Sequence, residues 1–463
     1  QYVKICSLYC VGFYYIPGTD TCMKIGGFVR SEWDFYANGS YTPQTALEYN
    51  RAANHLISRS RFLVSVDVRS QTAYGTLRGF GRFAWQWTTG DAITGGSGGT
   101  VYVDRAFIQL GGWTFGKTES FFQFNLADFG YTNQTQLLYN DTSGSGVPVL
   151  AYTASLGNGL TATIAAEDHF ENIGPNAAVT VASLAGAPAS ANLANTGALG
   201  QGGTIYPDVV GNLRVDQAWG SAQIAGAFVE NHPAYYSAGL GLGSIAHPSN
   251  RGSGAVEGGI KINLPMLGVG DSIGVSATYC DGASHYCSNN AATGGGVPGV
   301  PTLFTLTKGG VTGYGALYDG FYNNTGTPAQ PFGGLELSRT WNVNGGIQHS
   351  WNDQWKTSLW ATYLKYKAHS STVDAACALT PIGIGPGVQG PGCLDWSAYQ
   401  VGSRTLWNPV VNLDVSAEVM YSRVRTALDG TLAGGGATGT VPNTFGDRGT
   451  VSGILRFQRN FWP

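Results

Sequence analysis

The stretch RFLVSVDVRS, residues 61–70, decides between two kinds of β-structure. Its side chains alternate between apolar and polar, which places the two kinds on opposite faces of a strand. The apolar residues are Phe62, Val64, Val66 and Val68, and the polar residues are Arg61, Ser65, Asp67 and Arg69. In a soluble sandwich the apolar face would meet a core. In an outer-membrane barrel it would meet lipid, while the charged face would line a wet lumen.

Composition points to a single β-rich domain. The chain has 463 residues, and 11% of them are charged, against about 25% in typical soluble domains. It contains 69 glycines, and its mean hydropathy is -0.05. No linker, charge block or change of composition divides it. We therefore expect residues 1–463 to form one domain, in which residues 1–22 precede the first strand.

Several classes of protein are disfavoured at this stage. No apolar run approaches the roughly 18 residues of a transmembrane helix, whereas a barrel crosses a bilayer with strands of about ten alternating residues. The net charge of -3 and the pI near 6.2 leave no basic footprint, so no nucleic-acid partner is expected. The opening QYVKICSLYC lacks the basic start of a signal peptide, which predicts a mature, processed chain.

Segments that alternate like residues 61–70 recur along the whole chain. They lie near 23–37, 59–71, 76–87, 101–111, 113–124, 148–157, 160–171, 209–219, 221–231, 255–264, 272–281, 334–351, 354–367, 396–407, 412–426 and 448–461. A second clear apolar row is Leu413, Val415, Ala417, Val419 and Tyr421. Aromatic residues gather near strand ends, as interfacial girdles require: Trp33, Phe35, Trp85, Trp87, Trp407 and Phe461. The number of strands is about sixteen, and single-chain bacterial outer-membrane barrels have an even number.

The connections between these strands alternate in length. The short ones are GG near 111, GNG at 157–159, GS at 220–221, WND at 351–353 and NPV near 408. The long ones, rich in Gly, Pro, Asn and Ser, include 172–208, 282–332, 368–395 and 427–446. Long unstructured loops are uncommon in compact soluble domains. The pattern predicts an all-β, 16-stranded antiparallel transmembrane barrel with short periplasmic turns and long extracellular loops. The apolar rows would then face lipid.

Seven cysteines fall into three local groups. None forms a CxxC pair, and no histidine lies beside them at the spacing of zinc ligands, so no metal site is predicted. Loop-like surroundings favour disulfides in an oxidising compartment. The expected pairs are Cys6–Cys22, Cys280–Cys287 and Cys377–Cys393, which leaves Cys10 over. Unpaired structural thiols are the alternative, because connectivity does not follow from sequence.

Two terminal motifs resemble a known family. The stretch VKICSLYCVGFYYIPGTDTCMKIGGFVRSEWDFY (3–36) closely resembles the start of mature alphaproteobacterial porins, the family of the Brucella and rhizobial major porins. GILRFQRNF (453–461) resembles their last strand, although Trp462 and Pro463 follow here and Cys10 stands where the family usually has a small residue. The resemblance implies a homotrimer of 16-stranded barrels that passes small hydrophilic solutes by diffusion. It also implies that the third long loop folds into the barrel and narrows it.

Strand order makes residues 125–148 the third long loop, the expected constriction. Its carboxylates are Asp128 and Asp141. The basic candidates on the facing wall are Arg30, Arg61, Arg69, Arg78, Arg82, Arg105 and Arg456. Opposite charges on loop and wall would set a transverse field that orders water and disfavours apolar solutes. In the alternative, some arginines pair with Glu32, Asp34 or Asp67 to stabilise the wall, and others are solvated.

The leading functional prediction is a general-diffusion porin in the outer membrane, with no reaction and no cofactor. Its expected partners are the lipid bilayer, lipopolysaccharide, small hydrophilic solutes and ions. A substrate-selective channel, for example for an oligosaccharide, is a second possibility, because the loop contains Phe129, Tyr131 and Tyr139. An outer-membrane enzyme or adhesin is a third. However, GGSGG (95–99) fits G-x-S-x-G only in a Gly-rich loop, and the scattered histidines nominate no catalytic residue.

Overall fold

The structure is a computed structural model of the 463-residue chain. The residues that it describes are 4–35, 48–49, 56–89, 99–126, 129–131, 146–169, 176–179, 181–182, 190–191, 202–236, 247–288, 302–308, 311–323, 333–368, 371, 373, 388–389, 394–427, 429–431 and 444–461. Within these ranges, no helix is long and apolar enough to cross a membrane.

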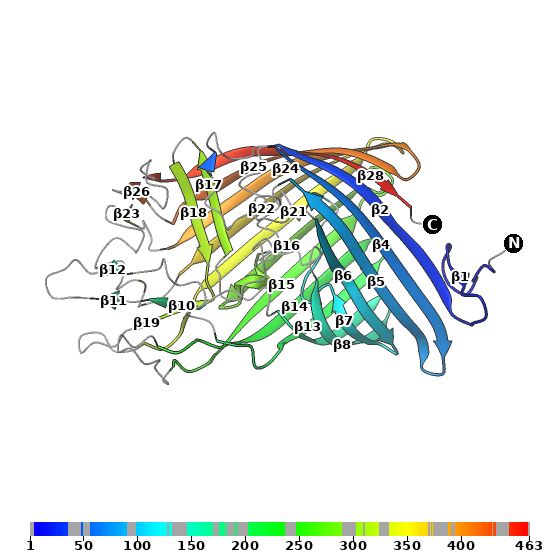
Figure 1. Ribbon diagram of the computed structural model, residues 1–463, viewed down its shortest axis with the longest axis horizontal. Coiled ribbons are helices and arrows are strands. Elements are labelled where there is room, and N and C mark those ends of the chain that lie inside the picture. The colour runs from blue at the N-terminus through cyan, green and yellow to red at the C-terminus, as the bar shows by residue number, and fades with distance from the viewer. Residues whose placement is uncertain are drawn as a thin grey trace.

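Among the described residues, sixteen strands pair into one closed antiparallel barrel (Figure 1). Neighbouring barrel strands pair in chain order, and β2 closes the ring against β28, with Phe28 opposite Asn460. The strands are β2 (Cys22–Phe35), β4 (Leu56–Thr72), β5 (Gly75–Thr88), β6 (Thr100–Leu110), β7 (Trp113–Thr118), β8 (Val147–Gly157), β9 (Leu160–Glu167), β13 (Asp208–Gln217), β14 (Gly220–Asn231), β15 (Arg251–Asn263), β16 (Ser272–Asp281), β21 (Arg339–Ser350), β22 (Trp355–Lys367), β24 (Trp396–Val410), β25 (Leu413–Arg425) and β28 (Arg448–Asn460). The predicted all-β, 16-stranded fold is confirmed. Closure also leaves the wall without an unpaired edge.

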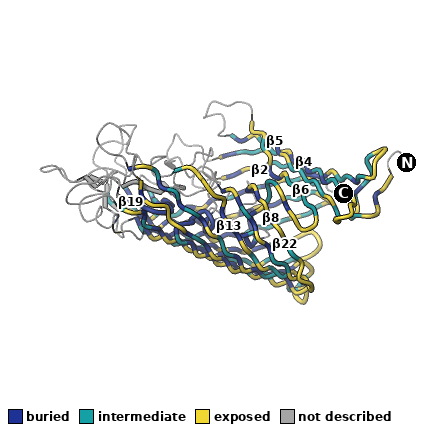
Figure 2. The backbone as a smooth tube through the Cα atoms, turned by 90° about the horizontal axis from the view of Figure 1, so that it is seen from below, coloured by how far each residue is buried: buried dark blue, intermediate teal, exposed yellow. Residues whose placement is uncertain are grey.

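The wall has an apolar outer face and a polar inner face. On β4, Phe62 is 42% exposed, whereas Ser65 and Asp67 on the opposite face are buried. The outer rows of other strands are exposed in the same way, as with Ile224 on β14. Exposed and buried positions are interleaved along the strands of the wall (Figure 2). Continuous apolar surface of this extent is far larger than soluble monomers carry, and a lipid-facing band accounts for it. The orientation predicted for residues 61–70 is therefore confirmed.

The two rims differ as predicted. Short turns, such as 111–112 between β6 and β7, join strands at one rim, where both chain termini lie (Figure 1). Gly111 and Gly112 have φ values of 56° and 90°, a left-handed conformation that favours glycine. Two of the predicted turns were misplaced. GS at 220–221 begins β14, and NPV near 408 lies within β24, because a bulge between Trp407 and Val410 accommodates a proline without an amide hydrogen.

The third long connection leaves the wall earlier than predicted. β7 ends at Thr118, not at 124, so the loop starts at Glu119 and not at 125. The cause is the buried carboxylate of Glu167 at the end of β9. It accepts a hydrogen bond from the Ser120 hydroxyl at 2.6 Å and one from the Phe121 amide at 2.8 Å. These two bonds turn the chain into the lumen, as the family resemblance implied.

A second inward element was expected only as loop. Within 282–332 the chain forms a hairpin of β17 (Thr302–Lys308) and β18 (Val311–Leu317), which packs against the inner face of β24, β25 and β28. The indole of Trp396 donates to the Ala316 carbonyl at 2.8 Å and lies against the ring of Phe304. Among the described residues, this is the largest cluster of buried apolar side chains. The other short elements are β3 (Glu48–Tyr49), β10 (Asn176–Val179), β11 (Val181–Ala182), β12 (Ser190–Ala191), η2 (Ser284–Tyr286), β19 (Gly320–Asn323), β20 (Glu336–Leu337), β23 (Val388–Gln389), β26 (Asp429–Thr431) and β27 (Thr444–Phe445).

The segment before the first barrel strand is a small knob at the short-turn rim. Its strand β1 (Tyr14–Tyr15) pairs with the start of β2. Lys24 donates to the Val11 carbonyl at 3.1 Å, and the guanidinium of Arg69 lies 4.8 Å from the Phe13 ring centroid. The knob is therefore held by inward-facing cations of β2 and β4.

Two of the predicted disulfides are confirmed. They are Cys6–Cys22, which ties the knob to β2, and Cys280–Cys287, at the end of β16. Cys377 and Cys393 lie outside the described residues, so their pairing stays a prediction. Cys10 is exposed and forms no disulfide with any described residue, in agreement with its being the cysteine left over.

Candidate permeation site

The loop that follows β7 runs along the inner wall and is bound to one strand after another. The contacts, in strand order, are Asn212 Nδ2 (β13) to the Phe121 carbonyl at 2.6 Å, Gln223 Nε2 (β14) to the Phe122 carbonyl at 2.8 Å, the Phe124 amide to Glu257 (β15) at 2.9 Å, the Ser358 hydroxyl (β22) to the Phe129 carbonyl at 2.6 Å and the Tyr131 amide to Glu418 (β25) at 3.0 Å. Inward polar side chains therefore satisfy the backbone of a buried loop, which would otherwise lose its hydrogen bonds to water.

Three glycines on the same inner face make room for the loop. A Cβ atom built on each would lie far inside van der Waals contact with a loop side chain. The nearest approaches are 2.2 Å for Gly259 and Phe124, 2.7 Å for Gly274 and Leu126, and 2.6 Å for Gly346 and Phe129. We call Gly259, Gly274 and Gly346 the glycine groove. It makes room for the described part of the loop, residues 119–126 and 129–131, against the inner wall.

The far end of the described loop lies among arginines. The guanidinium of Arg456 lies 3.3 Å from the Tyr131 ring centroid, and that of Arg404 lies 5.0 Å from it. The Tyr131 hydroxyl is hydrogen-bonded to Ser416. Phe129 is 1% exposed and Tyr131 is 8% exposed, so neither ring offers a free face on which a sugar could stack. Tyr139, the third aromatic predicted for such stacking, lies outside the described residues.

The predicted basic residues of the wall all face the lumen. The first group surrounds Glu32, whose side chain is buried. Arg30 and Arg59 lie 3.5 Å and 4.0 Å from its carboxylate, and Arg456 forms a closer ion pair with it. Next to this group, Arg61 donates to Gln86. A buried carboxylate with three guanidinium neighbours is well compensated, and the group as a whole keeps a positive charge.

The other predicted arginines lie elsewhere on the wall. They form two groups: Asp67 with Arg69 and Arg78, and Asp104 with Arg82 and Arg105. Arg105 also lies 3.3 Å from Glu119 at the start of the loop. Pairing with Glu32 and Asp67, the alternative considered from the sequence, is thus present in the structure. The acidic candidates Asp128 and Asp141 lie outside the described residues.

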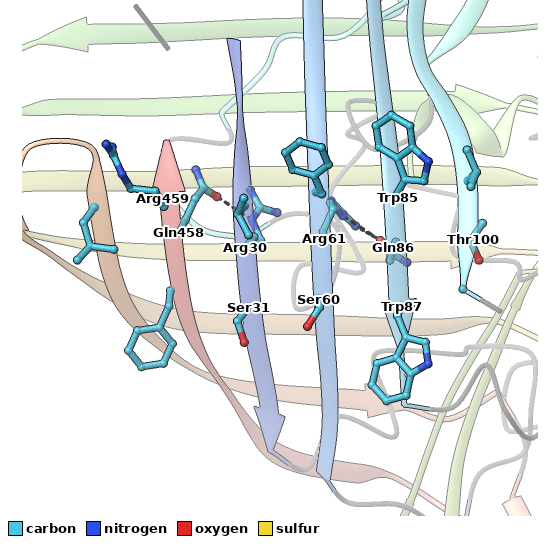
Figure 3. Close-up of a pocket in the computed structure, with 16 residues that line it drawn as sticks. Arg30, Ser31, Ser60, Arg61, Trp85, Gln86, Trp87, Thr100, Gln458 and Arg459 are labelled. Carbon is cyan, nitrogen blue, oxygen red and sulfur yellow. Dashed lines mark hydrogen bonds between the residues drawn. The ribbon is translucent and has the colours of Figure 1, made fainter. Parts of the chain in front are cut away.

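Figure 3 shows how this two-faced wall is built where β28, β2, β4 and β5 lie side by side. Arg30 donates to Gln458 at 2.7 Å, and Arg61 donates to Gln86 at 2.8 Å, so the inner row is linked across the strands. Trp85, on the outer face of β5, is 47% exposed. Cross-strand register fixes these pairs, because directly opposed residues project from the same face.

A cavity of about 510 Å³ lies in the lumen beside Tyr131. Its charged lining residues are Arg30, Lys261, Lys356, Arg404, Arg456 and Asp414. The carboxylates of Glu32 and Glu418 contact Arg456 and the Tyr131 amide, respectively. Asp34 also interacts with Arg456, and Arg59 lies at Glu32, so six cations stand against four acids in and directly beside the lining. The cavity therefore presents positive charge to a solute.

Sequence reasoning missed four of the basic residues in this region: Arg59, Lys261, Lys356 and Arg404. Alternation indicated three of them, since Arg59 shares the parity of Arg61 on β4, Lys261 lies between Ile260 and Ile262 on β15, and Arg404 lies on the inner face of β24. Lys356 lies at the start of β22, where Lys356, Thr357 and Ser358 do not alternate with apolar residues. The groove glycines carried no such indication, because a glycine in a strand has several possible causes.

Comparison with known proteins identifies the family. A family model described as a porin subfamily matches residues 1–454. Porin Omp2b of Brucella suis is 31% identical over 230 residues, and the Omp2b porin of Brucella canis is 30% identical over 228. These matches cover 48% of this chain and 56% and 55% of the relatives, so the chain spans about half the length of the curated relatives it matches.

A solved structure supports the same architecture. The crystal structure of the outer membrane channel DcaP of Acinetobacter baumannii superimposes with a TM-score of 0.60 at 12% identity, covering 96% of this chain and 99% of that one. At this identity the likeness concerns the fold alone. The match to the family model extends over nearly the whole chain and agrees with the closed barrel and its lipid-facing surface. The chain belongs to the porin subfamily and is a protein of the bacterial outer membrane.

Proposed function

We propose that this chain forms a water-filled pore for the passive diffusion of ions and small hydrophilic solutes, and that the pore favours anions. The observation that supports the proposal is the cavity beside Tyr131, whose lining holds five basic residues and one acidic residue. Family membership supports the channel, and the charge of the lining supports the preference. The described part of the loop lies against the wall, which is compatible with steady flux.

Coulomb's law gives the magnitude of the expected anion preference. One unit charge about 8 Å from an ion in water contributes ~0.5 kcal/mol, and a bilayer-embedded wall with little access to bulk water strengthens this interaction. Screening at ~0.1 M salt acts over about 10 Å, so charges at the cavity remain effective within the pore. Removal of one lining cation should therefore reduce the permeability of Cl⁻ by about twofold and raise that of K⁺ by a similar factor.

Planar-bilayer recording tests this proposal. We expect large, steady conductance that rises linearly with voltage, and a reversal potential on the anion-selective side in a KCl gradient. Lys356→Gln and Arg404→Gln should each shift that potential towards zero. Lys367→Gln is the matched control, because Lys367 lies at the exposed end of the same strand as Lys356, away from the cavity lining. A channel with no steady conductance, or a reversal potential that Lys356→Gln leaves unmoved, would contradict the proposal.

The acidic half of the constriction remains part of the proposal. Asp128 and Asp141 are expected to face the basic wall and to set a transverse field with it. Asp128→Asn and Asp141→Asn should then make the pore more anion-selective, since each removes a negative charge near the ion path. Unchanged reversal potentials in both variants would remove these residues from the constriction.

We further propose that the chain assembles as a homotrimer within the lipid and lipopolysaccharide of the outer membrane. The support is the family resemblance of the termini, together with an outer wall that is apolar on every described side. Native mass spectrometry in detergent is expected to give three copies per particle, and a monomer at all detergent concentrations would contradict the trimer.

A further inference from the structure

Four side chains from three separate stretches of the sequence meet near the start of the inward loop. Asp208, the first residue of β13, lies between two histidines. Its Oδ2 atom is 3.2 Å from Nδ1 of His169 and 3.1 Å from Nε2 of His285. The hydroxyl of Tyr286 is 3.0 Å from the same oxygen and 3.3 Å from His169 Nδ1. All four side chains are buried.

His285 Nε2 and the Tyr286 hydroxyl are hydrogen-bonded to the Asp208 oxygen, and His169 Nδ1 is a third polar atom close to it. In this way three groups converge on one carboxylate oxygen. The distances also agree with a shared metal ion. In a tetrahedral zinc site with bonds of ~2.0–2.1 Å, neighbouring ligand atoms are about 3.3 Å apart. The ligand atoms of His169, Asp208 and His285 all lie within 4.8 Å of one another.

The surroundings of His169 resemble those of a metal-bound histidine. Its second nitrogen, Nε2, lies 3.7 Å from the Glu167 carboxylate and has no hydrogen-bond partner among the described residues. Histidine ligands generally direct their other nitrogen at a carboxylate, which fixes the ring and raises its basicity. Glu167 is itself held by Ser120 and the Phe121 amide, so its position does not depend on the histidine.

Charge balance points the same way. Glu167 and Asp208 place two carboxylates in a region where every described side chain of the cluster is buried. Buried carboxylates are costly unless a nearby positive charge compensates them. The cations of the lumen described above lie in other groups, around Glu32, Asp67 and Asp104. One divalent ion would balance both carboxylates.

The site is also held rigidly, as metal sites need to be. The disulfide between Cys280 and Cys287 closes the chain around the 3-10 turn that carries His285 and Tyr286. The backbone amide of Ser284 donates to the Asp319 carboxylate at 2.7 Å. These contacts place the turn independently of any bound ion.

We propose that His169, Asp208 and His285 form a structural Zn²⁺ site, with Tyr286 on its fourth side. Two imidazole nitrogens and one carboxylate oxygen are a donor set that suits Zn²⁺, whereas Ca²⁺ and Mg²⁺ prefer oxygen ligands alone. The ion would clamp the ends of two long connections, 168–207 and 282–338, to the wall beside the start of the inward loop. Its role would be to hold that loop in place, because Glu167 contacts both the loop and His169.

Metal binding by the intact, folded barrel tests the proposal. Protein purified in detergent is washed with a chelator, and Zn²⁺ is titrated by isothermal calorimetry, with the bound metal counted by mass spectrometry. We expect one Zn²⁺ per chain, and at least a tenfold loss of affinity in His169→Gln and in His285→Gln. His349→Gln is the matched control, because His349 forms a similar pair with Asp271 at the opposite rim. Ca²⁺ and Mg²⁺ should not compete.

Two further measurements keep the test decisive if a histidine variant fails to fold. Folding of each variant is checked by the heat-dependent shift of the barrel in electrophoresis. Co²⁺ bound to the native chain should give the strong visible absorption of a tetrahedral site, and Zn²⁺ should displace it. The site would be overturned if the native chain did not bind Zn²⁺ stoichiometrically. It would also be overturned if the two histidine variants, when folded, bound Zn²⁺ as tightly as the native chain does. Neither outcome bears on the conductance measurement, so this site and the pore are tested separately.

Discussion

Replacing Gly259 by alanine puts a methyl group where the ring of Phe124 now lies. The added Cβ would be 2.2 Å from Phe124 Cδ1, and ordinary contact begins at 3.4 Å. The ring therefore has to retreat by about 1.2 Å. The ring does not retreat freely, because the Phe124 amide is hydrogen-bonded to Glu257, which lies on the same strand as Gly259. In addition, Phe124 is only 1% exposed.

Overpacking of this kind costs about 1–3 kcal/mol. Alanine also restricts the unfolded chain more than glycine does, which returns ~0.4–1 kcal/mol. We expect Gly259→Ala to lower the free energy of unfolding by about 1–2 kcal/mol. The displaced loop also moves towards the lumen axis, so single-channel conductance should fall. Stability is measured by urea unfolding in detergent, followed by tryptophan fluorescence, and conductance in a planar bilayer.

Gly258→Ala is the matched control. Gly258 lies next to Gly259 on β15, and a Cβ atom built on it meets nothing within 4 Å. It should leave stability within about 0.5 kcal/mol and conductance unchanged. In the Gly259→Ala background, Phe124→Leu should cost less than it does alone, because the smaller side chain relieves the overlap. If Gly259→Ala matches Gly258→Ala in both assays, the loop does not lie in the glycine groove.

Three other predictions follow from the rims and the lumen. Replacing Cys280 and Cys287 together by serine should lower the free energy of unfolding by about 2 kcal/mol, because the disulfide closes a short loop; reducing agent should lower it in the native chain and leave the variant unaffected. Burial favours neutral Asp271, but hydrogen bonds from His349 and the Ser350 amide outweigh it and lower the pKa of that carboxyl below 3.8. The stability that ionised Asp271 contributes is present above the pKa of this carboxyl in the unfolded chain and is lost as the pH falls through its lower pKa in the folded chain. Asp271→Asn should therefore have a lower free energy of unfolding than the native chain in urea at pH 6, and this deficit should shrink below about pH 4. A deficit that is equal at both values would contradict this assignment. The third prediction, that a chelator destabilises the native chain but not His285→Gln, is checked by the same unfolding assay.

The arginines predicted for the constriction lie at different heights along the bore, so they do not form one set. Arg30 and Arg456 lie at the cavity, where Tyr131 and Glu32 contact Arg456. Arg78 lies on the same inner face but is bound to Asp67, nearer the short-turn rim. Alternation assigned all three to the lumen, and it assigned none of them to a height along the bore. Height depends on strand stagger, which a single strand does not reveal.

The sequence by itself determined which face of each strand is apolar, and the asymmetry of the connections determined a membrane barrel with two unlike rims. These properties are local: side chains alternate with a period of two, and a turn occupies a few consecutive residues. Only the tertiary structure decided that Gly259, Gly274 and Gly346 line one groove. It also decided that His169 meets His285. Such contacts join residues from distant strands and loops, and they follow from the register and closure of the whole barrel, which depend on every strand together.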